Sequence, residues 1–333
     1  MICALLVGCT DATTFFPDKG TGTWVAMDGT PALGYRAIWS DVADDVYAVG
    51  TGGAAHYDGS QWETLNALGP TTYRAVWGRS ERQVWIGGDD AMFTRAVMGW
   101  EPQQLSDDGE PITHYSVLDI QGDDQHEYAL VQSGGQVLLF MNHGTTWETL
   151  YWSSTKRLPL DGRLVVLRDG SLLVAGDGAM VLCTPQRDLP LWDAVDASGW
   201  YSQPVLPVLR GLSGGAGFWA GAGRDAVVIQ DDDNDDFTLL VDQRDAIAPR
   251  SANDLYATSS SRMFVVGSPV VLRSPDPVSG VSKSPVEACD DHDCVLEPVF
   301  PPTQIATFTA VTGGLEGAVF ATSDQTVFRR AAK

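Results

Sequence analysis

Short apolar runs alternate with turn residues along almost the whole chain, and the stretch 35–65 shows this pattern most clearly. Within it lie four apolar runs, Tyr35–Trp39, Val46–Gly50, Ala54–Tyr57 and Trp62–Leu65. Glycine, aspartate and serine residues separate these runs, and such residues favour turns. The pattern therefore predicts four short strands joined by tight turns.

Copies of this four-strand unit recur to the end of the chain. The sequence of Tyr73–Gly88 repeats that of Tyr35–Gly50 without a gap, and weaker copies begin near Tyr115, Leu164, Leu206, Ala246 and Ile305. A single unit of this kind cannot bury both faces of its sheet. We therefore expect the copies to pack against one another in one domain that spans residues 22–333.

The two ends of the chain supply parts of the same unit. The seventh copy stops after three strands, whereas Gly22–Asp28 offers a lone strand with a tryptophan, like the fourth strand of most other copies. Repeats of about 40–50 residues with four strands each are typical of β-propellers. The sequence thus predicts an all-β fold, a seven-bladed β-propeller of four-stranded blades closed by the N-terminal strand, with six or eight blades as the alternatives.

The sixth copy is among the least regular. Its alignment with the first copy makes Leu255–Thr258, Met263–Val266 and Val270–Arg273 its second, third and fourth strands. The insertion 274–303, which is rich in Pro, Ser and Asp, would then join an outer strand to the next inner strand. Long connections in compact domains are usually functional or disordered. Two interpretations stay open, namely a segment that selects a partner and a passive flap.

Cys289 and Cys294 enclose a short acidic loop within this insertion. Their spacing suits a small disulfide in an oxidising compartment. Two unpaired thiols, or a metal site that includes His292, are the alternatives, although the spacing matches no standard zinc motif. Cys183 falls in the third strand of its copy and is expected to be an inert core residue.

The chain is strongly acidic. Its 333 residues carry a formal net charge of −22, and 44% of them are hydrophobic. The hydrophobic content excludes general disorder, and the charge argues against nucleic acid or an anionic membrane surface as a partner. The same charge favours basic partners or divalent cations, or serves only to keep a secreted protein in solution. No apolar run reaches the roughly 18 residues that a membrane span requires.

One acidic run is a candidate cation site. The run Asp231–Asp236 lies between two apolar runs of the fifth copy, where Asp231, Asp233 and Asp235 would supply the oxygen ligands that calcium prefers. The loop lacks the glycine and the distant glutamate of an EF-hand. A solvated hairpin tip is the alternative, and calcium is the only cofactor that the sequence suggests.

The N-terminus resembles the end of a bacterial lipoprotein signal. The stretch Leu6–Cys9 matches the lipobox, and Cys9 would carry the lipid. Such signals have a basic region and an apolar stretch of about 7–15 residues, whereas no Lys or Arg precedes Cys9 here. Either the true start lies upstream of Met1 or the match is accidental. The resemblance implies that residues 1–21 are a truncated signal and tether, and that the protein is extracytoplasmic, anchored by lipid to the cell envelope or outer membrane surface.

The hairpins His56–Trp62 and Asn142–Trp147 both end in tryptophan, and the second is similar to the pattern S-x-D-x-G-x-T-W, the Asp-box. In this they resemble the repeats of secreted bacterial propellers of the Asp-box/BNR type, a group that includes sialidase-like and photosystem-assembly-factor-like proteins. Asn142 stands in the place of the aspartate, and Phe140 in that of the serine. The resemblance covers residues 22–331. It implies a propeller in which the Asp-box has a structural role at the rim.

A sialidase-like site needs three arginines that hold a carboxylate, with a tyrosine nucleophile, a glutamate and a separate acid/base residue. Arg36 and Arg74 occupy equivalent positions in the first strands of their copies, and Arg210 lies in the first strand of the fifth copy. No Tyr–Glu pair accompanies them. We expect these arginines near the mouth of a central channel, where they pair with nearby acids or form a polar binding surface.

These observations favour a non-catalytic binding or scaffolding propeller that presents its loops to an envelope protein or a glycan. Nucleic acid is not an expected partner, and contact with a membrane is expected only through the lipid anchor. The alternative is a sialidase-like carbohydrate-active enzyme, a glycosidase or lyase. No catalytic residue can be named, because the sequence contains no phosphate loop, metalloprotease motif or recognisable Ser/His/Asp order.

Overall fold

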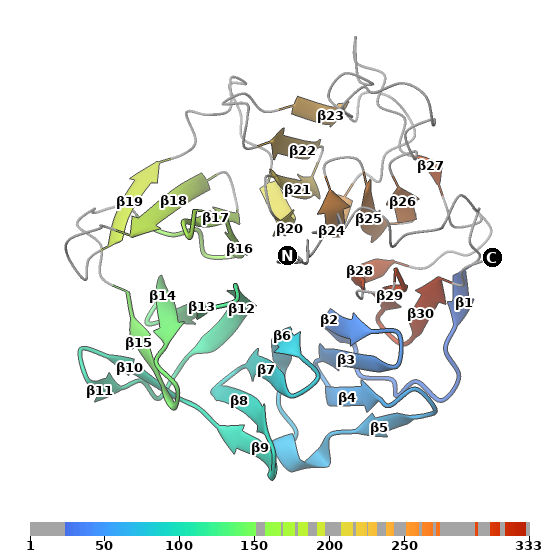
Figure 1. Cartoon of the computed structure of the whole chain (residues 1–333), viewed down its shortest axis with the longest axis horizontal. Helices are drawn as coiled ribbons and strands as arrows, with labels where there is room; N and C mark the ends of the chain where they lie inside the picture. Colours follow the sequence, from blue (N-terminus) through green and yellow to red (C-terminus); the bar gives the residue numbers. More distant parts are fainter. Residues whose placement is uncertain are drawn as a thin grey trace, which may run out of the picture.

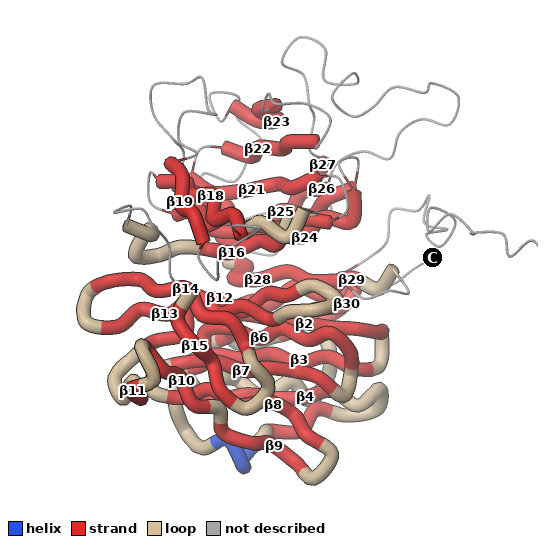
Figure 2. Tube along the Cα trace, turned by 60° about the vertical axis from the view of Figure 1, so that its left-hand side comes forward, coloured by secondary structure: helices blue, strands red, loops and turns tan. Residues whose placement is uncertain are grey.

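The computed structural model describes most of the chain's first half and the repeat strands of its second half. The described residues are 24–150, 157–167, 169–176, 179–185, 192–196, 208–215, 218–224, 226–231, 238–242, 251–259, 262–268, 271–273, 297–298, 307–313 and 317–330. Nearly all of their regular structure is strand, with one short turn of 3-10 helix, η2 (Asn66–Leu68), drawn in blue in Figure 2.

The described strands form seven sheets around a common centre (Figure 1). The first complete sheet contains β2 (Tyr35–Val42), β3 (Asp45–Gly50), β4 (Gly53–Tyr57) and β5 (Trp62–Thr64). The next contains β6 (Tyr73–Ser80), β7 (Gln83–Gly88), β8 (Ala91–Ala96) and β9 (Gly99–Pro102). The four strands predicted within residues 35–65 are therefore all present.

The third sheet has six strands, β10 (Gln104–Asp107), β11 (Glu110–Pro111), β12 (Ser116–Gly122), β13 (Glu127–Ser133), β14 (Gln136–Asn142) and β15 (Thr146–Thr149). The fourth contains β16 (Arg163–Val166), β17 (Leu172–Gly176), β18 (Ala179–Pro185) and β19 (Trp192–Asp196). The fifth contains β20 (Val208–Gly215), β21 (Phe218–Arg224), β22 (Ala226–Asp231) and β23 (Thr238–Asp242).

The sixth sheet contains β24 (Ser251–Ser259), β25 (Arg262–Ser268), β26 (Val271–Arg273) and β27 (Glu297–Pro298). The last combines β28 (Phe308–Gly313), β29 (Val319–Ser323) and β30 (Val327–Arg330) with β1 (Trp24–Ala26). β1 pairs antiparallel with β30, so that Val25 lies opposite Arg329. The prediction that the N-terminal strand completes the last sheet is thus confirmed.

The first strands of the sheets surround the centre and contact one another in chain order, from β2 through β6, β12, β16, β20 and β24 to β28. β28 then contacts β2, which closes the ring (Figure 1). The all-β propeller that the repeats predict is therefore the observed architecture.

Two extra strands in the third sheet were not predicted. β10 belongs to the connection that follows β9, and it pairs in parallel with the outer strand β15, while β11 pairs with β10. The segment that connects the second sheet to the third is therefore hydrogen-bonded to the outer strand of the third sheet. The repeat pattern gave no sign of this pairing, since it occurs in no other sheet of the described residues.

The strand assignment of the sixth copy was wrong by one place. Leu255–Thr258 lies within the first strand β24, Met263–Val266 lies within the second strand β25, and β26 is the third strand. The fourth strand is β27, which pairs with β26. The alignment failed because Asp254–Thr258 resembles Asp45–Val49 of the second strand β3 in sequence, although it lies in a first strand. The insertion therefore begins after a third strand instead of a fourth, and residues 274–296 lie outside the described part.

Apolar side chains of neighbouring sheets form the core between them. One buried cluster joins the first and second complete sheets through Tyr47, Tyr73 and Ile86. A further cluster joins the last sheet to the first complete one through Phe320 and Tyr35. Similar clusters lie between the second and third, third and fourth, fourth and fifth, and sixth and last sheets. The ring is thus stabilised mainly by burial between its sheets.

Glycines let the first strands approach one another closely. A Cβ atom placed on Gly78 of β6 would lie 2.7 Å from Cη2 of Trp39 on β2, and one on Gly122 of β12 would lie 2.5 Å from Cη2 of Trp77 on β6. The same relation holds further round the ring, for Gly214 with Val165 and for Gly313 with Tyr256. A large side chain on one inner strand therefore packs over a glycine on the next.

Replacement of Gly78 by alanine tests this packing. We expect Gly78→Ala to lower the free energy of unfolding by about 1–3 kcal/mol, because the added methyl group overlaps the Trp39 ring. In a Trp39→Phe background the smaller ring leaves room, so the same substitution should cost less. Urea denaturation of the four proteins of this double-mutant cycle gives the coupling. Equal costs in both backgrounds would show that the two residues do not depend on each other.

Candidate functional site: the central channel

The first strands enclose a cavity of about 1220 Å³ that runs along their length. Residues from all seven first strands line it, from Arg36 and Arg74 near the start of β2 and β6 to Asp41 and Arg79 near their ends. This cavity is the central channel that the repeat pattern leads us to expect.

A β-bulge occurs at the same place in six of the first strands, where the register with the second strand shifts by one residue. A bulge of this kind places an extra residue in one strand and redirects its side chain. The extra residues are Arg36, Arg74, Leu118, Arg210, Asn253 and Thr309. All of them except Arg210 line the channel. The three arginines named from the sequence therefore occupy one register position, and we call the channel end that carries Arg36, Arg74 and Arg210 the arginine mouth.

Arg74 is paired at this mouth. Its Nε lies 2.9 Å from Oδ1 of Asp89 and its Nη2 lies 3.3 Å from Oδ2. The Ser116 hydroxyl donates a further hydrogen bond of 2.6 Å to Oδ1 of Asp89. The hydrogen bonds from Arg74, together with that from Ser116 and the charge of Arg36, hold the pKa of Asp89 below its usual range. Arg74 thus matches the interpretation in which the arginines pair with nearby acids.

Arg36 is more accessible to a ligand than Arg74 is. Its side chain is exposed and lines the channel. Within the described part of the chain it forms no direct ion pair with a carboxylate, although its charge acts on Asp89. A guanidinium in this state can bind a carboxylate, sulfate or phosphate group without first breaking a salt bridge.

Arg210 lies further round the mouth. Its Nη1 is 3.5 Å from Oδ1 of Asn253, which occupies the bulge position on the next strand. Asn253 in turn donates a 2.7 Å hydrogen bond to the backbone oxygen of Phe308. Polar contacts therefore continue across the bulge positions of β20, β24 and β28.

Arg163 is a further arginine that lines the channel, and it was not among the residues singled out from the sequence. Its Nε donates to the backbone oxygen of Arg210 at 2.9 Å, and its Nη1 donates to that of Leu118 at 3.1 Å. Both acceptors are bulge residues, so Arg163 holds the bulges on either side of its own strand. Alignment of the first strands could have revealed it. Arg163 begins its strand one position after the position that is equivalent to Arg36 in β2.

Asp119 and Asp254 lie one position below the bulge on β12 and β24, and both line the channel. Oδ2 of Asp119 accepts a 2.9 Å hydrogen bond from the backbone nitrogen of Leu164 on the next first strand. Oδ2 of Asp254 accepts an equivalent 2.9 Å bond from Val311. Each carboxylate therefore joins two neighbouring first strands.

Burial shifts both carboxyl groups toward the neutral form. Removal from water raises the pKa of Asp254 to about 7, against hydrogen bonds from Val311 and Leu255 and the charge of Arg163. Burial raises the pKa of Asp119 also, and Arg163 again opposes the shift. Desolvation disfavours the ionised form of a carboxyl group, which is the cause in both cases. Asp254 thus changes charge near neutral pH.

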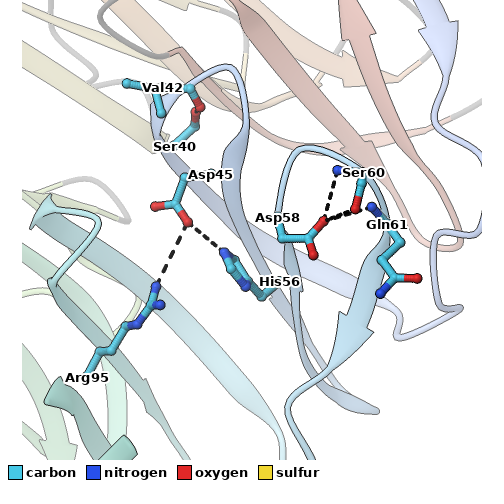
Figure 3. A network of polar contacts seen from close by, with 8 residues as sticks. All are labelled: Ser40, Val42, Asp45, His56, Asp58, Ser60, Gln61 and Arg95. Carbon is cyan, nitrogen blue, oxygen red and sulfur yellow. Dashed lines mark hydrogen bonds and ion pairs between the residues drawn. The ribbon is translucent and has the colours of Figure 1, made fainter. Parts of the chain in front are cut away.

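A second polar cluster lies away from the channel, between the first two complete sheets (Figure 3). Oδ1 of Asp45 on β3 lies 2.6 Å from Nε2 of His56 on β4 and 3.9 Å from Nη1 of Arg95 on β8. His56 stacks on the buried ring of Tyr47 at a centroid distance of 4.3 Å. Because it links side chains of two sheets at a largely buried place, this cluster has a structural role.

The two Asp-box-like hairpins also have structural roles. Oδ1 of Asp58 accepts hydrogen bonds from the backbone of Ser60 and Gln61, both at 2.9 Å (Figure 3), which holds the pKa of Asp58 at about 2. Asn142 accepts a 2.8 Å bond from the nitrogen of Gly144 and donates to Glu127 at 3.0 Å. Both side chains therefore close the turn between a third and a fourth strand.

Several predicted sites lie outside the described residues. They are Cys9, Cys289, Cys294, Asp233, Asp235 and the greater part of the insertion 274–303. Asp231 ends strand β22, and the calcium site stays a prediction. In the described part, no three His, Cys, Asp or Glu side chains are grouped as a metal site requires. Cys183 is buried as expected, and burial raises the pKa of its thiol to about 12.

Solved structures with the same fold are numerous. The WD40 β-propeller domain of Doa1 is 14% identical with a TM-score of 0.63, over 94% of this chain and 98% of that one. YCF48 bound to a D1 peptide is 14% identical with a TM-score of 0.64, over 95% and 96%. Virginiamycin B lyase from Staphylococcus aureus is 8% identical with a TM-score of 0.64, over 92% and 97%. Identities this low show the propeller fold alone.

No family model matches the chain, and no curated protein matches its sequence. Among the helices of the described residues, none is long and apolar enough to cross a membrane. Function must therefore be argued from the channel and its charges.

The raised pKa of Asp254 predicts a pH dependence of stability. In the folded protein Asp254 holds its proton up to about pH 7, whereas its ordinary pKa is 3.8. Its contribution to stability is therefore fully present below the unfolded pKa and is lost as the pH rises toward 7. The slope is at most about 1.4 kcal/mol per pH unit.

Urea denaturation between about pH 4 and pH 8 measures this dependence. The free energy of unfolding of the unsubstituted protein, minus that of Asp254→Asn, should fall across this interval, because asparagine does not titrate. Other carboxylates contribute equally to both proteins and cancel. A difference that stays flat would show that Asp254 is ionised throughout.

Proposed function

We propose that this chain is a non-catalytic binding or scaffolding propeller whose arginine mouth binds an anionic group of a protein partner. The single observation that carries the proposal is the common register of Arg36, Arg74 and Arg210, which six equivalent bulges create at one end of the channel. Each of the seven sheets is, on this proposal, one blade of a single closed ring.

Electrostatics support this assignment. The chain as a whole carries a net charge of −22, yet among the described residues four arginines and three aspartates line the channel. The channel is thus locally basic within an acidic protein. Charges gathered in a concave site with low-dielectric walls raise the local concentration of ligands of opposite charge. An anionic group is therefore drawn to the mouth and repelled from the remaining surface.

The fold suits a protein partner. YCF48, which has the same fold, was solved bound to a D1 peptide, and propellers place loops from successive sheets around one opening. An envelope protein is accordingly the partner that we propose, and a glycan with acidic groups is the alternative. The contact needs no cofactor, although calcium bound at Asp231, Asp233 and Asp235 would lower the repulsion near the fifth sheet.

The proposed location is extracytoplasmic, with Cys9 as the lipid attachment site. The match of Leu6–Cys9 to the lipobox supports this location, as does the spacing of Cys289 and Cys294, which suits an oxidising compartment.

Expression in a bacterial host, with any coding sequence that precedes Met1 and with a radiolabelled fatty acid, tests the anchor. Label should appear on the protein and disappear from the Cys9→Ser variant, and the unsubstituted protein should partition with membranes. Unlabelled protein that is nevertheless exported would mean that the lipobox match is accidental.

A second candidate function is that of a carbohydrate-active enzyme, and one observation favours it. Asp119 and Asp254 lie directly below the arginines, and Asp254 titrates near neutral pH, as a general acid or base must. Against it, both carboxylates accept bonds from backbone amides. Of the described residues that line the channel, one is a tyrosine, Tyr256, and none is a glutamate. Release of sugar from sialylated glycans by the purified protein, abolished in Asp254→Asn, would establish the enzyme instead.

Substitution of the two lining arginines tests the binding proposal. We expect Arg36→Gln combined with Arg74→Gln to weaken binding of pyrenetetrasulfonate, a fluorescent tetra-anion, by at least about tenfold. Arg82→Gln is the matched control, because Arg82 is exposed on the turn between β6 and β7, at the other end of the strand. Fluorescence titration gives the dissociation constants. If Arg82→Gln weakens binding as much as the double variant, the anion binds by net charge and not at the mouth.

The same three proteins can also identify the partner. Each serves as bait on native envelope extract, and bound molecules are recovered after cross-linking. Stoichiometric recovery of one protein by the unsubstituted and Arg82→Gln baits, but not by the double variant, is the expected result. Retention of glycan in the same pattern would favour the alternative partner.

A further inference from the structure

The wall of the channel is arranged in layers of different charge. The bulge residues form the layer at the arginine mouth. The residue that follows each bulge forms the next layer, which holds Asp119 on β12 and Asp254 on β24. Arg163 belongs to this second layer on β16, because the backbone amides of Leu164 and Val311, each one residue further along its strand, donate equivalent bonds to Asp119 and Asp254. The equivalent register positions on the other first strands are Ala37, Ala75, Gly211 and Ala310. Ala37 lines the channel.

Asp254 is the carboxylate of this layer with fewer hydrogen-bond partners, although burial raises the pKa of Asp119 as well. The partners of Asp254 in the described part of the chain are the backbone amides of Val311 and Leu255, and no side chain forms a direct ion pair with it. Asp119 has two backbone amides and also the side chain of Gln121.

Charged and titratable groups face Asp254 from several strands. Arg163 and Asp119 act on it across the channel, and on its own strand Asn253 and Tyr256 lie beside it. β20 brings Arg210, which contacts Asn253. The β28 residues that line the channel carry no charge, and they are Thr309, Val311, Thr312 and Gly313. Val266 of β25 lies opposite Asp254. Arg36 and Arg74 lie in the layer above, and Asp41 and Arg79 lie near the far end.

We propose that Asp254 sets the anion affinity and the charge selectivity of the channel, its carboxylate acting as a removable counter-charge one layer beneath the arginine mouth. This inference rests on the proposed function of that mouth. With Asp254 ionised, the channel holds a negative charge below the arginines that repels the end of an entering anion. With Asp254 protonated, the channel carries one more net positive charge, and anions bind more tightly.

Burial brings the titration of the Asp254 carboxyl group close to neutral pH. Because burial raises its pKa to about 7, the carboxyl group is largely neutral in a mildly acidic medium and largely ionised in a mildly alkaline one. The hydrogen bond to Val311 does not require the negative charge, since a neutral carboxyl oxygen also accepts it. Protonation can therefore alter the field in the channel while the first strands stay in place.

The test measures pyrenetetrasulfonate binding from about pH 8.5 to about pH 5.5, an interval over which the sulfonates stay ionised. Fluorescence titrations are made at constant ionic strength on the unsubstituted protein, Asp254→Asn and Asp41→Asn. Asp41 is the matched control, because it is also an aspartate that lines the channel and whose pKa burial raises, but it lies at the far end. Near-ultraviolet circular dichroism checks that each variant is folded.

We expect the unsubstituted protein to bind about three- to tenfold more tightly at the acidic end of the series, with the change centred near pH 7. Asp254→Asn should bind tightly at every pH and lose most of this change, whereas Asp41→Asn should keep it. An unsubstituted protein whose affinity does not rise on acidification would overturn the inference, even if Asp254→Asn did not fold. Equal pH profiles for Asp254→Asn and the unsubstituted protein would overturn it as well.

The arginine variants separate this inference from the proposal on which it depends. If Arg36→Gln with Arg74→Gln leaves binding unchanged, the mouth itself is not the site and both proposals fail. If that double variant loses binding while the pH profile does not depend on Asp254, the mouth stands and only the role of Asp254 is contradicted.

Discussion

The contact between successive first strands, closed by β28 against β2, is the constraint on which the rest of the structure depends. Where a first strand carries a large ring, the next first strand has a glycine facing that ring. Gly78 of β6 faces Trp39 of β2 in this way. The contact between first strands also requires the last sheet to be completed by β1 from the other end of the chain. Because the ring is closed, equivalent residues of distant repeats are brought to one opening, and a bulge repeated in six strands becomes a ring of side chains.

The charges of the channel follow from this geometry. Arginines at the bulge positions face an opening, where they keep access to water. Aspartates one position lower are partly removed from water, and they accept amide hydrogen bonds that join one sheet to the next. Arg163 lies between them and bonds the backbone on both sides of its strand. The same residues thus stabilise the ring and determine which ligands it attracts, so stability and binding are expected to respond together to pH.

Much of the fold could be predicted from the sequence, because each repeat carries its own apolar runs and turn residues. The strands of the first copy, the closing strand β1 and the common position of Arg36 and Arg74 all follow from alignment of the repeats. The parallel pairing of β10 with β15 could not, since it occurs in one sheet and involves a connection. Nor could the importance of Asp254, because its pKa depends on burial and on Arg163, which stands far away in the chain. The assignment of the sixth copy failed because Asp254–Thr258 of the first strand β24 resembles Asp45–Val49 of the second strand β3 in sequence.

The central claim is that the arginine mouth is the place where anions bind, and hydrogen exchange locates a bound anion directly. Exchange of the unsubstituted protein is followed by mass spectrometry with and without saturating pyrenetetrasulfonate. The account expects slower exchange in peptides that contain the starts of β2, β6, β16 and β20, and unchanged exchange in the hairpins β4–β5 and β8–β9. Slower exchange confined to those outer hairpins, with the starts of the first strands unaffected, would contradict it.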